Sequence, residues 1–322
     1  MKKTGPKQRI RTWIIWIIFA LVFQFILINI SAALHAYKLT HLRIAEEKPV
    51  KKASENVFSK TWRLFSGPVC YKRALTEVPA FNYSTIILKT SDSISIETWY
   101  SKTDSISKGT VILFHGLSGN KGMLLSEAGE FRILGYNVML VDLRNHGHSG
   151  GGVFTYGYRE AEEVKLAYDH VIQSGERNIF LWGASLGAVE VAKAVNDYDL
   201  ALSGLIIEMP FLSLQTHLKW RARSLNFPQK PFAFFTCCWI GLENGFNGFG
   251  LRTDKYVKKI HCPVLMQYGK KDEVVASYET ESVFKAIASP NKKLVEYENA
   301  GHESLFRNDP LTWVNEMKNF LK

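Results

Sequence analysis

The pattern of apolar and polar positions divides this chain into an N-terminal segment and a much longer second part. Residues 12–34 contain no charged side chain and are almost wholly apolar from Trp13 to Ile30. As a helix, these positions reach roughly 35 Å at about 1.5 Å per residue, which is enough to cross the hydrocarbon core of a bilayer. The pattern therefore predicts a transmembrane helix at 12–34 and a folded domain at 84–322.

A cleaved signal peptide is the alternative interpretation of the first apolar run, because a basic tail at residues 1–11 precedes it and small residues follow it. The apolar region of a signal peptide usually spans only about 7 to 15 residues, so an uncleaved anchor is favoured. Basic residues flank the run on both sides, and the side of the membrane stays open. Residues 35–83 are predicted as a linker or membrane-proximal segment with a short helix near 55–65.

The alternation of short β-branched runs with helix-length segments after residue 84 predicts a mostly parallel sheet with helices on both faces. Only four residues separate the first two expected strands, which suits an antiparallel hairpin. The stretch at about 211–259 is too long for a simple crossover and predicts an inserted cap. The eight expected strands are Thr85–Lys89, Ile94–Tyr100, Thr110–Phe114, Asn137–Val141, Asn178–Trp182, Gly204–Glu208, Val264–Tyr268 and Lys293–Tyr297.

Net charge concentrates at the N-terminal end of the chain. The 322 residues carry a formal charge of +10, but residues 1–73 hold 14 Lys and Arg against three Glu, whereas residues 74–322 hold 26 basic and 27 acidic groups. We expect the basic excess to face anionic lipid headgroups, or to be a merely solvated linker. No basic patch with interleaved aromatics lies in the second part, so nucleic acid is not an expected partner. The four cysteines have no metal-ligand spacing.

The most informative motif is Gly-Ala-Ser-Leu-Gly at 183–187, between a strand-like run and a helix-like run. In a nucleophile elbow a serine occupies a strained strand-to-helix turn, and flanking glycines let neighbouring backbone approach. The motif predicts Ser185 as a nucleophile. Taken alone, the same letters also describe a tight turn with a helix-capping serine.

Acyl transfer by serine further requires a base and an acid that orients the base. Asp272 follows the strand expected at 264–268, and His302 follows the last expected strand. The carboxyl ends of parallel strands share one edge of a sheet, where such sheets place ligands. Glu208 is an alternative acid at the end of another strand, while Asp272 and His302 also suit roles in capping or packing helices.

With these residues in the order Ser, Asp, His, the chain resembles the α/β-hydrolases over about residues 84–322, and most closely their small-capped, membrane-associated esterase and lysophospholipase-like branch. The run His115-Gly116-Leu117 resembles the oxyanion loop of the family. The resemblance implies that the backbone N–H groups of Leu117 and Leu186 form the oxyanion hole.

A second loop, from Asp142 to Ser149, resembles the D-x-R-G-H-G-x-S sequence of the family, with Asn145 where glycine is usual. This loop has a structural role in the family, so the departure leaves the resemblance intact. We assign His115, His146 and His148 to loop structure and expect no direct chemistry from them.

The resemblance implies a serine hydrolase that cleaves carboxylic esters through a Ser185-His302-Asp272 triad and an acyl-enzyme, with no metal or organic cofactor. Eight large aromatics in the cap segment could line an acyl-chain pocket or pack the cap, and a membrane tether favours a lipid-like ester. A serine peptidase, amidase or thioesterase would share the triad, although no acidic cluster for an N-terminal amine is evident. A non-catalytic membrane-anchored binding protein is a less favoured reading, and the oligomeric state stays open.

Overall fold

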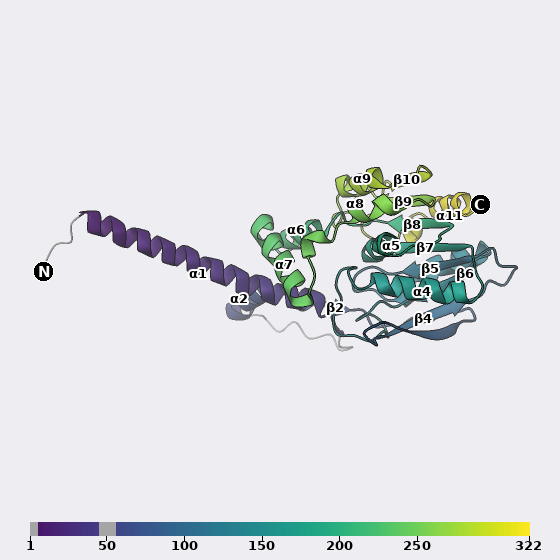
Figure 1. The fold of residues 1–322 in the computed structure, drawn as a ribbon, viewed down its shortest axis with the longest axis horizontal. Helices are drawn as coiled ribbons and strands as arrows, with labels where there is room; N and C mark the ends of the chain where they lie inside the picture. Colours follow the sequence, from purple (N-terminus) through teal and green to yellow (C-terminus); the bar gives the residue numbers. More distant parts are fainter. Residues whose placement is uncertain (1–5, 45–55) are drawn as a thin grey trace.

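The structure is a computed structural model that describes residues 6–44 and 56–322, drawn in Figure 1. The predictions made for residues 1–5 and 45–55, within the basic tail and the linker, lie outside the described residues. An eight-stranded sheet forms the centre of the domain, and two short strands pair separately. The strands are β1 (Arg43–Ile44), β2 (Tyr71–Lys72), β3 (Ser84–Lys89), β4 (Ser95–Ser101), β5 (Thr110–Phe114), β6 (Asn137–Val141), β7 (Ile179–Ala184), β8 (Gly204–Glu208), β9 (Val264–Gly269) and β10 (Lys292–Tyr297).

The large sheet confirms the predicted α/β architecture. Its strand order is β10-β9-β8-β7-β5-β6-β4-β3, and all eight expected strands are present with ends within two residues of the prediction. Strands β3 and β4 pair antiparallel across the predicted turn, with Lys89 opposite Ser95. Strand β4 is also antiparallel to β6, whereas all pairs among β5 to β10 are parallel. The central strands read as continuous apolar runs because both of their faces are buried.

Helices cover both faces of the sheet. Buried side chains of α4, α5 and α9 pack on one face, and those of α3 and α11 pack on the other. Helices α6 and α7 belong to the cap, between the sheet and α1 in Figure 1. The helices are α1 (Pro6–Thr40), α2 (Val57–Ser66), α3 (Leu125–Ile133), α4 (Ala161–Gln173), α5 (Leu186–Asp197), α6 (Leu214–Ser224), α7 (Gln229–Asn244), α8 (Thr253–Tyr256), α9 (Ser277–Ala286), α10 (Leu305–Asn308) and α11 (Pro310–Phe320).

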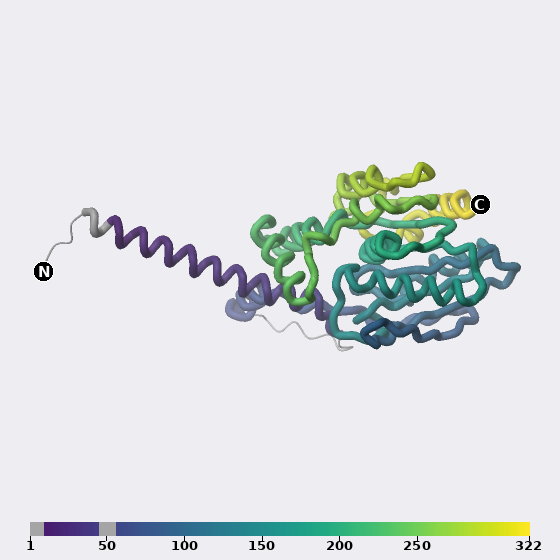
Figure 2. Tube along the Cα trace, viewed as in Figure 1, coloured from purple at the N-terminus to yellow at the C-terminus, as the bar shows by residue number. Residues whose placement is uncertain are grey.

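Helix α1 extends beyond the predicted span of 12–34 at both ends and projects from the body of the molecule, as the tube in Figure 2 shows. It contains a segment long and apolar enough to cross a membrane. Its side chains are exposed from Ile10 to Leu27, and a buried stripe then begins with Ala32, Ala36 and Leu39. These positions recur every three or four residues and form one helical face, so the helix continues where that face packs on the cap.

Contacts between α1 and α7 join the apolar helix to the cap. The rings of Phe25 and Phe235 meet edge to face with centroids 5.7 Å apart. The indole N–H of Trp239 donates to Oδ1 of Asn29 at 3.2 Å. This bond gives the polar side chain of Asn29, within an apolar helix, a partner on the cap. Ala36, Leu39 and Leu42 are buried as well, so the start of the segment predicted as a linker packs into the folded body.

Candidate active site

Ser185 lies on the turn between β7 and α5, in the conformation expected of a nucleophile elbow. Its φ of 53° and ψ of −112° are unusual for a residue with a Cβ atom. Its backbone N–H donates to the carbonyl of Glu208 at 2.7 Å, which ties the turn to the end of β8. Such backbone strain persists only where surrounding structure holds it.

The two glycines of the motif are required by close packing of backbone around this turn. A Cβ atom at Gly183 would lie 2.5 Å from the carbonyl oxygen of Gly187. A Cβ atom at Gly187 would lie 2.3 Å from the carbonyl oxygen of Phe114 at the end of β5. Real Cβ atoms do not approach backbone this closely, so α5 can begin against β5 and β7 only with glycine at both positions.

The structure brings Ser185, His302 and Asp272 together, although they lie far apart in the sequence. Oγ of Ser185 is 2.8 Å from Nε2 of His302, and Nδ1 of His302 is 2.7 Å from Oδ2 of Asp272. The other carboxylate oxygen, Oδ1, accepts the backbone N–H groups of Val274 and Val275 at 2.8 Å each. These bonds fix the carboxylate, which in turn favours a proton on Nδ1 and leaves Nε2 to accept from the serine hydroxyl.

Backbone packing positions the loops that carry Asp272 and His302. The carbonyl of Ala300 accepts the N–H of Lys271 at 2.9 Å. A Cβ atom at Gly269 would lie 2.4 Å from the same carbonyl, so glycine at the end of β9 permits this approach. The loop after β9 and the loop after β10 are thus held edge to edge, and their two functional side chains meet.

The expected oxyanion loop lies against the nucleophile. A Cβ atom at Gly116 would be 3.3 Å from Cβ of Ser185, which places the backbone before Leu117 directly beside the serine. Leu186 is the first residue of α5, so its N–H has no acceptor within the helix. The positive end of the α5 dipole also faces this point and favours negative charge there.

The loop from Asp142 to Ser149 is held together by its own polar groups. The Asp142 carboxylate accepts the backbone N–H of His148 at 2.9 Å and binds the Lys121 ammonium. Asn145 has a φ of 57°, in the left-handed region that asparagine tolerates better than most residues. This conformation explains why asparagine can occupy the position where the D-x-R-G-H-G-x-S sequence usually has glycine.

Two of the three loop histidines, His115 and His146, use their ring nitrogens to bind backbone groups of neighbouring loops. Nε2 of His115 accepts the N–H of Leu143 at 3.2 Å, and Nε2 of His146 accepts the N–H of Ser118 at 3.1 Å. Burial lowers the pKa of both rings, that of His146 to about 3, so both are neutral at physiological pH. They connect the loop from Asp142 to the oxyanion loop.

The alternative acid, Glu208, is buried at the end of β8, where it also lines the pocket beside Ser185. Its Oε1 accepts the indole N–H groups of Trp182 and Trp313 and the amide of Gln267, at 2.8 to 3.1 Å. Burial raises its pKa to about 8 despite these donors. Its side chain makes no hydrogen bond to His302 among the described residues, so the geometry favours Asp272 as the partner of the imidazole.

Replacing Glu208 by glutamine is predicted to leave ester hydrolysis within about threefold of the wild type and to change stability in a pH-dependent way. From about pH 5 to about 8 the folded wild type keeps a proton that the unfolded chain has lost. Its free energy of unfolding therefore falls by up to about 1.4 kcal/mol per pH unit from this group, and Glu208→Gln removes that part of the slope. Urea unfolding across this range measures the difference, and a loss of activity as large as that of an Asp272 variant would contradict the assignment.

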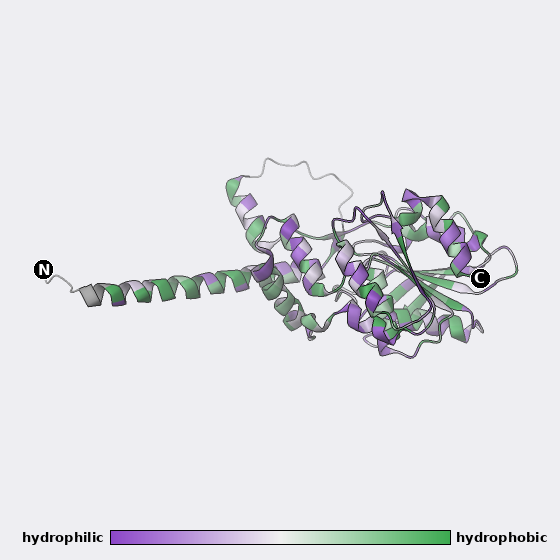
Figure 3. Cartoon of the chain, turned by 90° about the horizontal axis from the view of Figure 1, so that it is seen from above, coloured by the Kyte–Doolittle hydropathy of each residue, from purple (hydrophilic) through white to green (hydrophobic). Residues whose placement is uncertain are grey.

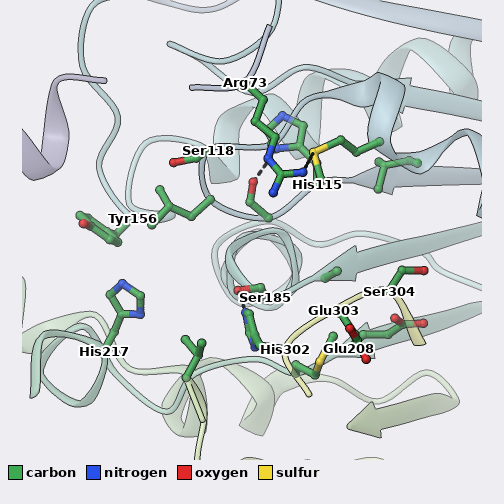
Figure 4. A pocket seen from close by; sticks show the side chains of 18 of the residues that line it. Arg73, His115, Ser118, Tyr156, Ser185, Glu208, His217, His302, Glu303 and Ser304 are labelled. Carbon is green, nitrogen blue, oxygen red and sulfur yellow. Dashed lines mark hydrogen bonds between the residues drawn. The ribbon is translucent and has the colours of Figure 1, made fainter. Parts of the chain in front are cut away.

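A pocket of about 430 Å³ opens beside Ser185, and Figure 4 shows side chains that line it. Sequence analysis did not anticipate several of its walls. Leu39 and Leu42, at and just beyond the end of α1, line it together with His217 from α6. Nδ1 of His217 is buried without a hydrogen-bond partner in the described structure, and burial lowers its pKa to about 3. The spacing of Ala36 and Leu39 was the available signal that α1 continues into the fold.

The cap aromatics mostly pack rather than line this pocket. Of the eight aromatics noted in the sequence, Trp220 alone is among the residues lining the pocket in the described chain. Phe235 and Trp239 pack on α1, and Phe246 stacks on Tyr158 with centroids 4.5 Å apart. Of the two readings of these aromatics, the structure therefore favours packing of the cap over lining of the pocket.

Folding also assembles an acidic group that the sequence did not reveal. Glu127, Glu208 and Glu303 line one end of the pocket, and Figure 4 labels the last two. Burial raises the pKa of Glu127, and it raises the pKa of Glu208 to about 8, so burial disfavours the charged form of both carboxyl groups. Of these three residues, Glu303 is the exposed one.

Fold and site together define an α/β-hydrolase. The model of the family described as serine aminopeptidase, S33, matches residues 105–234 and 244–310, which is more than half of the chain. The chain therefore belongs to that family. Families of this fold contain several chemistries on the same catalytic geometry, so the family's description does not fix the substrate of this chain.

Relatives and solved structures agree with this assignment. The chain is 26% identical to YqkD of Bacillus subtilis, over 66% of this chain and 70% of that protein. It is also 26% identical to a yeast protein named as the membrane protein YNL320W, over 70% of this chain and 76% of that protein. The esterase Pf2001 of Pyrococcus furiosus superposes with a TM-score of 0.61 at 21% identity, over 75% of this chain and 92% of that structure. An esterase of Exiguobacterium antarcticum superposes with a TM-score of 0.56 at 18% identity, over 74% and 99%.

Proposed function

We propose that this chain is a membrane-anchored serine hydrolase that cleaves carboxylic esters with an apolar, lipid-like acyl group. The observation that carries the proposal is the continuous hydrogen-bonded series from Ser185 through His302 to Asp272 beside an open pocket. The side chain of His302 is 22% exposed and that of Asp272 only 3%, so the base meets the pocket while the acid is shielded from water. This is the arrangement that activates a serine hydroxyl.

In the proposed reaction, Oγ of Ser185 forms a bond to the acyl carbon while its proton passes to Nε2 of His302. The carbonyl oxygen becomes an oxyanion, which the N–H groups of Leu117 and Leu186 stabilise. The bond to the alcohol oxygen then breaks, and that oxygen takes the proton from His302. Water attacks the acyl-enzyme by the same route, with His302 as base, and releases the carboxylic acid. Throughout, Asp272 orients the ring and stabilises its charge.

The proposed substrate class follows from the walls of the pocket and from α1. Leu39, Leu42 and Leu117 line the pocket; Leu39 lies near the end of α1, which contains the candidate span, and Leu42 follows that end. An anchored enzyme with such a wall works close to the bilayer, where esters with long acyl chains are concentrated. Apolar walls also favour burial of methylene groups, at about 0.8 kcal/mol for each.

Amide hydrolysis is a second candidate, supported by the acidic end of the pocket. Glu303 could attract the amino group at the N-terminus of a peptide. Burial raises the pKa of Glu127 and Glu208 and so disfavours the charged carboxylates that would strengthen this attraction, which makes ester hydrolysis the better supported proposal.

A substrate panel tests the proposal. We expect kcat/KM for an ester of a ten-carbon acyl group to exceed that for the acetyl ester of the same alcohol by at least about tenfold, because more acyl surface is buried. The same panel includes the matching thioester and an aminoacyl amide with a free N-terminus. Preference for the acetyl ester would contradict a lipid-like substrate, and faster cleavage of the amide would favour a peptidase.

A further inference from the structure

Helix α2 exposes an apolar face that the fold of the domain does not use. Val57, Phe58 and Trp62 are 81%, 79% and 55% exposed, and Leu64 is 45% exposed. The helix is nonetheless well formed, since Asn56 caps it by accepting the N–H of Ser59 at 2.8 Å. A cluster of large exposed apolar groups on one short helix marks a surface that contacts something apolar.

Side chains of α1 hold the end of α2 in place. Oγ of Ser31 donates to the carbonyl of Phe65 at 2.6 Å, and Nε2 of His35 lies 3.0 Å from the carbonyl of Leu64. The Lys38 ammonium donates to the carbonyl of Gly67 at 2.6 Å. Three carbonyl groups at the end of α2 thus obtain partners from α1, which replaces the bonds that a helix end lacks. The level of α2 along α1 is therefore fixed at residues 31–38.

Residues 31–38 of α1 lie just beyond the part of the helix that is suited to the hydrocarbon core of a bilayer. The exposed stretch from Ile10 to Leu27 would span roughly 27 Å as a helix, close to the thickness of that core. In Figure 3 the projecting helix is coloured mainly as hydrophobic up to the point where it meets the body of the molecule. If α1 crosses a bilayer, α2 lies at its boundary with water.

An apolar groove of about 410 Å³ lies between α1, α2 and the start of α7. Its walls include Leu27 and Ile28 from α1, Leu64 and Phe65 from α2, and Phe232 from α7. Leu27 belongs both to the groove and to the exposed apolar surface of α1. The groove therefore opens to the same medium as that surface. A surface at this level contacts the outer part of lipid acyl chains.

We propose that α2 is an interfacial helix that places Phe58 and Trp62 in the leaflet at the end of the α1 span, and that the groove binds an acyl chain of a phospholipid in that leaflet. The inference rests on the proposed membrane anchoring by α1. The exposed basic side chains of Lys60 and Arg63 on α2 suit the anionic headgroups of such a leaflet. In this arrangement the cap and the pocket are held at the membrane surface.

Photo-crosslinking of the full chain tests the proposal directly. The protein is reconstituted in vesicles of phosphatidylcholine and phosphatidylserine, four parts to one, with a phospholipid that carries a diazirine on its acyl chain. Mass spectrometry is expected to find adducts in peptides covering 57–66 and 227–232, as well as in the span of α1. Adducts in α1 alone would overturn the inference and leave the anchoring intact, whereas their absence from α1 would contradict the anchoring itself.

A matched pair of variants adds a functional readout. Phe58→Asp with Trp62→Asp changes two exposed residues of α2, and the control Ile133→Asp with Leu311→Asp changes two equally apolar residues that are 77% and 79% exposed on α3 and α11. We expect the α2 variant to lose at least about tenfold in adducts and in hydrolysis of a vesicle-embedded ester. Its rate on a soluble short-chain ester should match that of the control, which separates this inference from the hydrolase proposal. An α2 variant with undiminished adducts would refute the interfacial position.

Discussion

Replacing Ser185 by alanine is expected to reduce kcat/KM for a carboxylic ester by at least about 10⁴-fold, because Ser185 is the hydroxyl that the described structure places in hydrogen-bond contact with Nε2 of His302. The serine hydroxyl contributes its hydrogen bond to Nε2 of His302 at 2.8 Å. Its loss removes one bond at a half-buried position, so the free energy of unfolding should change by no more than about 1.5 kcal/mol. Ester hydrolysis and urea unfolding measure the two effects.

Ser118→Ala is the matched control. Ser118 also lines the pocket, and its φ of 62° is positive like the 53° of Ser185. We expect this variant to keep its rate within about threefold. If Ser185→Ala retained a normal rate, or if both variants lost activity equally, Ser185 would not be the nucleophile.

Replacing Asp272 by asparagine should lower kcat by about 10⁴-fold with little effect on folding. The carbonyl oxygen of asparagine can still accept the N–H groups of Val274 and Val275, as Oδ1 does now. The amide nitrogen would then face Nδ1 of His302 and donate to it. The ring would carry its proton on Nε2 instead, where it could no longer accept from Ser185.

The control for this change is Glu273→Gln, which removes an exposed carboxylate next to Asp272 without touching the imidazole. Steady-state kinetics of both variants on one soluble ester give the comparison. A fully active Asp272→Asn, together with an inactive Glu208→Gln, would reverse the assignment of the acid.

The sequence predicted the sheet and the meeting of the candidate triad because each depends on local signals. Gly183 and Gly187 flank Ser185 in a motif that requires glycine, because a Cβ atom at these positions would lie 2.5 and 2.3 Å from backbone oxygens. Asp272 and His302 follow strands that end at the same edge of a parallel sheet, so their proximity follows from strand direction alone.

The walls of the pocket were not predictable in the same way, because they depend on packing between distant segments. Leu39 lies in a stretch that reads as linker, and its burial depends on the cap. Glu127 and Glu303 are 176 positions apart, and no local pattern indicates that they line one pocket end. The role of Glu208 in the core likewise depends on Trp313, which comes from the last helix.

The most direct test of the central claim is labelling of the full-length protein with a fluorophosphonate, followed by intact-mass measurement and peptide mapping. The account predicts one adduct per chain, formed on Oγ of Ser185 with release of fluoride, and no adduct in the Ser185→Ala variant. Folded protein that stays unlabelled, or that is labelled at another residue and equally in the variant, would contradict it.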